Sequence, residues 1–400
     1  MSLDFSKSDG KPYKNIVLIG ENGSGKTSVL KQISNHFAGG NIKNSDFVCK
    51  KGDGQPMDTP NLSTGFCFSG VLTKYSNEKE FVNPRERNES DIDAKTYEKD
   101  VSEKDIKDLF LNIVRKDNDD LAKTVHKQLG MSSDEYSSFK FQSRLNRFKS
   151  AFNNFFEKLR FDSADYETGK ILFQKNGKKF EMVSLSSGEK QIVVRGSSIL
   201  KNLKNMKDGV ALIDEPENGM HPRWAKKIMK FYEDLVTIKG NQLAQLIFAT
   251  HSELVLETAL ADRENTLVIL LKDNKGTIES DRINGSFVLP SLTSAEINYE
   301  AFHIVSNDYH NQLYACLQEQ SKISSVKGTD EIILNSPFFN NETDFRESGH
   351  GTCKYKTLAT YIRNAIDHPD SGNKFTEQEL EDSIELLQKI CSAFSKSKQN

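Results

Sequence analysis

NIVLIGENGSGKTS, residues Asn15 to Ser28, joins a short buried-strand pattern to a helical pattern through a glycine-rich loop. The loop matches G-x-x-x-x-G-K-[ST] in the expected context, with a strand before it and a helix after it. Its glycines let the backbone turn tightly and point N–H groups at phosphates, and the helix dipole adds to this attraction. An ordinary glycine turn is the alternative. The stretch predicts an α/β domain with a nucleotide site formed by Asn22, Gly23, Ser24, Gly25, Lys26, Thr27 and Ser28.

A phosphate loop needs a carboxylate that holds the metal, and GVALIDEPEN supplies one. We expect Lys26 to reach the β- and γ-phosphates of ATP and Thr27 to ligate Mg²⁺. The apolar run GVALI predicts a buried strand that ends at Asp214 and Glu215. Asp214 would hold Mg²⁺, and Glu215 would orient and polarise the attacking water. Alternatively these residues begin a helix or loop, which Pro216 fits equally well.

AQLIFATHSE, residues Ala244 to Glu253, ends another strand pattern at His251. This histidine is predicted to contact the γ-phosphate and to assist catalysis, although a histidine at a strand end often has a structural role. The helical pattern HPRWAKKIMKFYEDLV separates this strand from the acidic one. Strand, helix and strand in this order predict a parallel sheet.

The rest of the chain suggests two regions. We expect a domain over 1–283 that contains a charged, helical insertion at 71–160, and a mainly helical region over 284–400. GKILFQKNGKKFEMVSL predicts a hairpin with an Asn176-Gly177 turn. Apolar residues at helical spacing in the insertion indicate a helix that packs into the protein's own core or against a partner: Leu145, Phe148, Phe152, Phe155 and Leu159.

Composition limits the class of protein. Hydrophobic residues at 36% and charged residues at 28% describe a water-soluble globular chain, and a net charge of −3 gives no global case for nucleic-acid or membrane binding. No apolar run approaches the roughly 18–20 residues that span a bilayer. The N-terminus lacks the apolar core of a signal peptide. The five cysteines are scattered without a CxxC pair. A cytoplasmic protein with no membrane segment is expected.

The phosphate loop, LSSGEKQ (Leu185 to Gln191), LIDEPEN and ATHS occur in an order that resembles the ABC-type ATPases, whose signature loop is usually written LSGGQ. The resemblance covers about Asn15 to Lys272 and implies a P-loop ATPase head with a mixed sheet that binds ATP and Mg²⁺. It also implies a homodimer or larger symmetric homo-oligomer, because the signature loop of one subunit closes over ATP held by another. Ser186, Gly188 and Glu189 would then lie at the nucleotide of a second copy, and Glu217 to His221 would form the D-loop. Gln55 and Gln142 are candidates for the glutamine loop.

DEPENGMHP resembles the "DEPE-x-x-L-H-P" version found in prokaryotic AAA/ABC ATPases related to the overcoming-lysogenization-defect nucleases, with Met220 where leucine is usual. The topoisomerase-primase domain of those nucleases is not evident in the C-terminal sequence. The tail instead resembles ATPases of the Septu antiphage type, which work with a separate HNH nuclease subunit. The resemblance implies an ATP-gated sensor that controls a nuclease. A DNA-repair ATPase, whose insertion from Val71 to Leu159 lies along duplex DNA, is an alternative.

Arg363 and His368 form an R-N-x-x-x-H pattern, which resembles the catalytic motif of HEPN ribonucleases. In those enzymes the two residues act on a scissile RNA phosphate by acid/base catalysis and charge stabilisation. The pattern is short, and Pro369 with Asp370 also fits a simple helix end. Arg363 and His368 are therefore either a second catalytic site or part of a partner-docking region.

Overall fold

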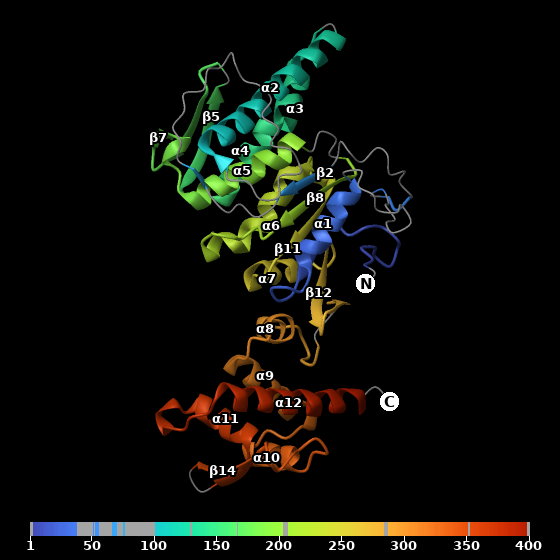
Figure 1. Ribbon diagram of the computed structural model, residues 1–400, viewed down its shortest axis with the longest axis vertical. Coiled ribbons are helices and arrows are strands. Elements are labelled where there is room, and N and C mark those ends of the chain that lie inside the picture. Colours follow the sequence, from blue (N-terminus) through green and yellow to red (C-terminus); the bar gives the residue numbers. More distant parts are fainter. Residues whose placement is uncertain are drawn as a thin grey trace. The chain divides into compact units, whose positions relative to one another are not determined.

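The computed structural model describes residues 3–37, 51, 53–55, 66–69, 75–76, 101–128, 130–165, 167–202, 207–283, 287–350 and 353–397. The chain divides into two compact units, Met1–Arg282 and Ile283–Asn400 (Figure 1). No helix within the described ranges is long and apolar enough to cross a membrane.

A six-stranded sheet forms the centre of the first unit, in the order β13-β12-β1-β11-β8-β2. Five neighbouring strands run parallel, whereas β13 pairs antiparallel with β12. The predicted α/β fold with a mixed sheet is confirmed. The strands are β1 (Asn15–Ile19), β2 (Phe66–Ser69), β8 (Gly209–Asp214), β11 (Ala244–Ala249), β12 (Thr266–Asn274) and β13 (Thr277–Arg282).

Helices cover both faces of this sheet, which is why the central strands are continuous apolar runs. On one face, Leu30 of α1 (Lys26–Phe37) belongs to the same buried cluster as Ile16 and Leu18 of β1. On the other face, Tyr232 of α6 (Pro222–Val236) packs against Phe248 of β11, with ring centroids 5.8 Å apart. Two further helices of this unit are α5 (Ser187–Asn202) and α7 (Glu253–Ala261).

The helical insertion was predicted over 71–160, and the described part of that range contains three helices. Its helices are α2 (Glu103–Gln128), α3 (Ser133–Gln142) and α4 (Arg144–Phe155), and a three-stranded sheet follows, formed by β5 (Leu159–Asp165), β6 (Lys170–Lys175) and β7 (Lys178–Glu181). Both turn residues of the β6–β7 hairpin have positive φ, Asn176 at 51° and Gly177 at 77°, as a two-residue hairpin turn requires. Short elements elsewhere in the unit are β3 (Tyr75–Ser76), β4 (Val101–Ser102), β9 (Thr237–Ile238), β10 (Asn241–Gln242) and the 3-10 turn Met182–Ser184.

The aromatic stripe of α4 packs into the unit's own core. Phe148 lies between Phe110 of α2 and Phe161 of β5, with ring centroids 4.8 Å and 5.6 Å away. The prediction that the helical stripe extends to Leu159 is wrong. Phe156 has extended backbone (φ −96°, ψ 136°) and ends the helix, and Leu159 begins β5.

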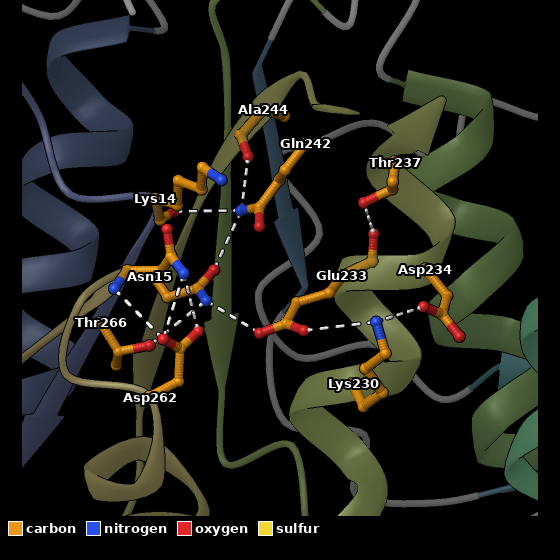
Figure 2. A network of polar contacts seen from close by, with 11 residues as sticks. Lys14, Asn15, Lys230, Glu233, Asp234, Thr237, Gln242, Ala244, Asp262 and Thr266 are labelled. Carbon is orange, nitrogen blue, oxygen red and sulfur yellow. Dashed lines mark hydrogen bonds and ion pairs between the residues drawn. The ribbon is translucent and has the colours of Figure 1, made fainter. Parts of the chain in front are cut away.

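A partly buried polar cluster joins β1, α6 and β12 at the amino ends of the parallel strands, as Figure 2 shows. We call Asn15, Glu233, Gln242 and Thr266 the Asn15 network. Asn15 Nδ2 donates to Glu233 Oε1 at 2.8 Å and to Thr266 Oγ1 at 3.4 Å, and Gln242 Nε2 donates to Asn15 Oδ1 at 2.9 Å. Burial raises the pKa of Glu233, and the nearby ammonium of Lys230 opposes that shift. The network satisfies both ends of the Asn15 amide.

The second unit contains the helices α8 (Ser294–Phe302), α9 (Asn307–Ser321), α10 (Val326–Leu334), α11 (Leu358–Asp367) and α12 (Glu377–Ser397). Its mainly helical character was predicted, but the hairpin of β14 (Phe345–His350) and β15 (Cys353–Thr357) was not. Leu313 and Leu317 of α9 share one buried core with Ile384 and Leu387 of α12. Thr357 caps the start of α11, and the buried carboxylate of Asp330 holds this cap by accepting a hydrogen bond from Thr357 Oγ1 at 2.6 Å. The 3-10 turn Pro369–Ser371 follows α11.

Candidate functional site

The carboxyl ends of three adjacent parallel strands bring the predicted ATP-site residues to one edge of the sheet. The phosphate loop follows β1, His251 follows β11, and Asp214 ends β8. The register places Leu18 beside Ala249 and Ala249 beside Asp214. Ligands of open α/β sheets bind outside the carboxyl ends of the strands. We call this the phosphate-loop edge.

The phosphate loop needs its first glycine for a steric reason. Gly20 has φ +146°, and a Cβ there would lie 2.2 Å from the carbonyl oxygen of Leu271 on β12. Gly23 and Gly25 also have positive φ, at 91° and 89°. A Cβ on Gly23 would meet nothing within 4 Å, so the outer side of the loop is open. The loop therefore packs tightly against the sheet while its outer side can receive a ligand.

Lys26 closes back over the loop. Its Nζ donates to the carbonyl oxygens of Gly20 at 2.8 Å and Glu21 at 2.7 Å, and the residue is only 7% exposed. Burial lowers the pKa of Lys26, and the carboxylates of Glu215 and Asp214 oppose part of this shift. The Lys26 ammonium thus lies at the phosphate loop. From the sequence, it was predicted to contact the phosphates of ATP. Of the other loop residues, Asn22, Gly23 and Ser28 are exposed, while Ser24 is buried and its hydroxyl has no partner among the described residues.

Thr27 and Asp214 meet at the predicted magnesium position. Thr27 Oγ1 donates to Asp214 Oδ2 at 3.0 Å and lies 3.3 Å from Oδ1. Burial raises the pKa of Asp214, and the hydrogen bond from Thr27 counteracts part of the rise. Hydroxyl and carboxylate oxygens are hard ligands that suit Mg²⁺, which usually takes only one or two protein carboxylates. Within the described ranges, no group of three His, Cys, Asp or Glu side chains could hold a metal. The pair therefore fits an Mg²⁺ completed by phosphate oxygens and water.

Glu215 and His251 face each other next to this pair. His251 Nδ1 lies 3.5 Å from Glu215 Oε1, and both side chains are partly exposed. The backbone N–H of Glu215 donates to Ala249 at 2.8 Å, which ties the end of β8 to the end of β11. Glu215 has φ +43°, a left-handed conformation that is costly for a residue with a Cβ. Such strain concentrates at functional sites.

Glu217 is an additional carboxylate at this edge. From the sequence, Glu217 was predicted only as part of the D-loop. Its Oε1 accepts a hydrogen bond from Thr250 Oγ1 at 2.6 Å, and burial raises the pKa of Glu217. Its position two residues after Glu215 was visible in DEPEN, but the sequence gave no sign of its contact with Thr250.

The signature loop begins helix α5 with a reciprocal cap. Ser186 N donates to Glu189 Oε2 at 2.8 Å, and Glu189 N donates to Ser186 Oγ at 3.4 Å. Lys175 on the β6–β7 hairpin lies 3.5 Å from Glu189 Oε1. Gly188 is buried, since a Cβ there would lie 3.1 Å from the Trp224 ring and 3.4 Å from the carbonyl oxygen of Gly219. Ser186 and the next residue are exposed at the start of the helix. The serines rather than the glycine are thus accessible to a ligand.

Arg195 links helix α5, which begins at the signature loop, to β8, the strand that ends at Asp214. It is 1% exposed on α5, and its Nη1 donates to the backbone carbonyl of Asp214 at 3.0 Å. A buried arginine within an apolar helical run was not singled out from the sequence, although its charge among apolar neighbours was a usable signal.

Arg363 and His368 lie in the second unit. Arg363 Nη2 forms an ion pair with Asp367 Oδ2 at 2.7 Å, and its Nη1 donates to Asn364. His368 ends helix α11 and is exposed. Their nuclease role stays a prediction. Of the glutamine-loop candidates in the first unit, Gln142 ends α3 and donates to Ser138, and Gln55 lies in an exposed turn.

Residues 68–257 match a family model described as "AAA domain, putative AbiEii toxin, Type IV TA system". This segment, less than half of the chain, is similar to AAA-family ATPase domains. The match includes LSSGEKQ, the DEPE segment and ATHS, and it begins after the phosphate loop. No curated protein matches the chain.

Among solved structures, cbiO1 from Clostridium perfringens, part of the ABC transporter complex cbiONQ, is 16% identical, with a TM-score of 0.33. That match covers 67% of this chain and 77% of cbiO1. The SMC head domain from Thermotoga maritima is 13% identical, with a TM-score of 0.35, and covers 68% of this chain and 92% of that one. An SmcHead bound to the C-winged helix domain of ScpA gives 13% identity, a TM-score of 0.37 and coverages of 68% and 91%. These similarities are too distant to transfer a function.

Proposed function

We propose that the protein binds and hydrolyses ATP with Mg²⁺, and that it acts as the sensor or regulatory subunit of an antiphage defence complex by controlling a separate nuclease. The observation that carries the ATPase part is the phosphate-loop edge. There, Thr27 lies 3.0 Å from Asp214, and Glu215 lies 3.5 Å from His251. One pair offers metal ligands, and the other offers a carboxylate and an imidazole at the place where a γ-phosphate would lie.

Each residue at this edge has a distinct role in the proposed mechanism. Lys26 exchanges its carbonyl partners for phosphate oxygens, and Thr27 and Asp214 hold the metal. Bound Mg²⁺ would neutralise charge on the β- and γ-phosphates. Glu215 orients and polarises the attacking water, and His251 contacts the γ-phosphate. The left-handed backbone of Glu215 aims this side chain, because the hydrogen bond from its N–H to Ala249 fixes the peptide.

A homodimer would complete this site. Ser186 and Ser187 are exposed at the N-terminus of α5, where unpaired N–H groups and the helix dipole favour an anion. In the proposal, these serines of one copy face the γ-phosphate bound by a second copy. ATP binding therefore closes the dimer, and hydrolysis opens it.

The first experiment measures ATP turnover and oligomeric state for the wild type, Glu215→Gln and Ser186→Arg. Glu215→Gln is expected to retain ATP and accumulate dimers, because the amide cannot activate water. Ser186→Arg should stay monomeric and bind ATP without hydrolysing it, while Ser186→Ala, which loses the cap without adding bulk, controls for helix destabilisation. Normal turnover in Glu215→Gln, or an ATP-independent monomer in all variants, would refute the respective assignment.

The effector part of the proposal needs a separate test. The protein would be purified with the products of its neighbouring genes, with and without ATP, and retained proteins would be identified by mass spectrometry. We expect a small HNH nuclease whose cleavage activity changes with Glu215→Gln. If instead an antitoxin, or no neighbour, were retained, the nuclease-control hypothesis would be wrong while the ATPase assignment stood.

A further inference from the structure

Two loops at the phosphate-loop edge are joined by a pair of hydrogen bonds. The first is the backbone bond from Glu215 N to Ala249 O at 2.8 Å. The second joins side chains, from Thr250 Oγ1 to Glu217 Oε1 at 2.6 Å. Thr250 directly precedes His251 in the chain. By binding the Thr250 side chain, Glu217 therefore fixes the backbone next to the histidine.

Thr250 is fixed on three sides. Its N–H donates to Leu18 at the end of β1 at 3.0 Å, and its Oγ1 accepts from Ser252 N at 2.9 Å while donating to Glu217. The side chain is fully buried. Thr250 thereby connects the strand before the phosphate loop, the histidine loop and the acidic loop.

A carboxylate suits this position because it only accepts hydrogen bonds. The single hydroxyl proton of Thr250 must point at Glu217, which leaves a lone pair for Ser252 N. Glu217 Oε2 is buried and has no hydrogen-bond partner among the described residues. Keeping an incompletely paired carboxylate out of water costs free energy, and groups held at such a cost cluster at functional sites.

We propose that Glu217 is a positioning residue, which acts through Thr250 to hold His251 beside Glu215. The inference rests on the proposed ATPase function for its kinetic readout only. Glu217 does not have to touch nucleotide or water. Its effect on turnover comes from the angle and distance of the imidazole relative to the γ-phosphate.

The test compares Thr250→Val, Thr250→Ser and Glu217→Gln with the wild type. Valine has the shape of threonine without the hydroxyl, serine restores the hydroxyl, and glutamine replaces the acceptor-only group by one that also donates. We expect Thr250→Val to lower kcat about tenfold or more with KM for ATP within about twofold, because misplacing the imidazole that contacts the γ-phosphate removes part of its contribution to transition-state stabilisation. Glu217→Gln should lie between Thr250→Val and wild type, and Thr250→Ser should restore most of kcat.

The second unit provides a matched control. Thr357 Oγ1 donates to the buried Asp330 Oδ1 at the same distance, 2.6 Å, and Thr357 is also fully buried. Thr357→Val therefore removes an equivalent hydrogen bond in the other unit. We expect it to lower the melting temperature comparably while leaving kcat unchanged.

A structural readout separates this inference from the ATPase proposal. Crystal structures of the wild type and Glu217→Gln would give the distance from His251 Nδ1 to Glu215 Oε1, and the imidazole is expected to move away or become disordered in the variant. An unmoved histidine, or a kcat loss in Thr357→Val as large as that in Thr250→Val, would overturn the positioning role. A wild type that does not hydrolyse ATP would refute the proposed function, and the histidine's position would still decide this inference.

Discussion

The two ends of the central sheet both contain buried polar side chains, but those side chains are arranged for different purposes. In the Asn15 network, the amide of Asn15 bonds at both its nitrogen and its oxygen (Figure 2). At the phosphate-loop edge, the buried hydroxyl of Ser24 and one oxygen of Glu217 have no partner among the described residues. Satisfied buried polar groups stabilise a fold, whereas unsatisfied ones cost free energy. The comparison separates an end whose buried amide is fully paired from the end that is proposed to bind a ligand.

The largest expected effect comes from Lys26→Ala at the phosphate-loop edge. The substitution removes a charge-assisted hydrogen bond to phosphate, which is worth about 1.5–3 kcal/mol, so ATP affinity should fall roughly tenfold to a hundredfold. Calorimetric titration with a non-hydrolysable ATP analogue measures this. Lys31→Ala on α1 is a suitable control, because Lys31 is an exposed lysine of the same helix. Unchanged affinity in Lys26→Ala would remove the ligand-binding interpretation of this edge.

The same edge should show a trade-off between metal binding and stability. Because burial raises the pKa of Asp214, its ionised form destabilises the nucleotide-free fold at neutral pH, and that cost is absent below the ordinary carboxyl pKa. Asp214→Asn should therefore raise the melting temperature without nucleotide, while increasing the Mg²⁺ needed for half-maximal hydrolysis about tenfold or more. Chelation by EDTA should abolish turnover in the wild type. A variant that is less stable and equally sensitive to Mg²⁺ would contradict this prediction.

At the other end of the sheet, a substitution in the Asn15 network should lower stability and leave ATP turnover unchanged. Asn15→Ala removes the donor to the buried Thr266 Oγ1 and to the half-buried Glu233 Oε1, and it should lower the free energy of unfolding by about 1–3 kcal/mol. Gln242 Nε2 keeps the carbonyl oxygens of Lys14 and Ala244 as acceptors. ATP turnover at a temperature where the variant is folded should stay near that of the wild type. Chemical denaturation and a turnover assay test both parts. A selective loss of turnover would show that the two ends are coupled.

The smallest expected effect is the pH dependence at Glu233. Burial raises its pKa, so the folded protein binds its proton more tightly than the unfolded chain does. The stabilisation is therefore fully present below the ordinary glutamate pKa and is lost as pH rises through the folded-state pKa. Glu233→Gln should gain stability relative to the wild type as pH increases. Melting curves of both proteins between pH 4 and 8 test this. If their melting temperatures differed by the same amount at every pH, Glu233 would not be the source of a pH-dependent stability.

Local patterns were sufficient to predict several parts of the fold. A strand, a glycine loop and a helix follow one another over Asn15 to Phe37, and the Asn176-Gly177 turn joins a hairpin, because both patterns depend on neighbours in sequence. The end of α4 was misjudged, since Leu159 continues the helical spacing although the backbone is already extended at Phe156. The β14–β15 hairpin was missed in a polar stretch with no alternating apolar pattern.

From the sequence, only those residues of the candidate site that lie at or next to strand ends could be predicted to be close together. Parallel strands bring their carboxyl ends to one edge, so Thr27, Asp214, Glu215 and His251 were expected to be close. The contact of Glu217 with Thr250 joins residues 33 positions apart, and Arg195 reaches a backbone carbonyl of another element. Such pairings depend on side-chain directions that no spacing rule specifies.

The chain contains a single tryptophan, and that residue is Trp224. Its ring packs against Phe156, with centroids 5.0 Å apart, and lies where any side chain on Gly188 would have to go. Intrinsic fluorescence excited at the indole band therefore comes only from the junction where Gly188 packs against Trp224 and Gly219. The protein carries an optical reporter at this junction, and a stopped-flow trace on unlabelled protein would record movement of the signature loop as it happens.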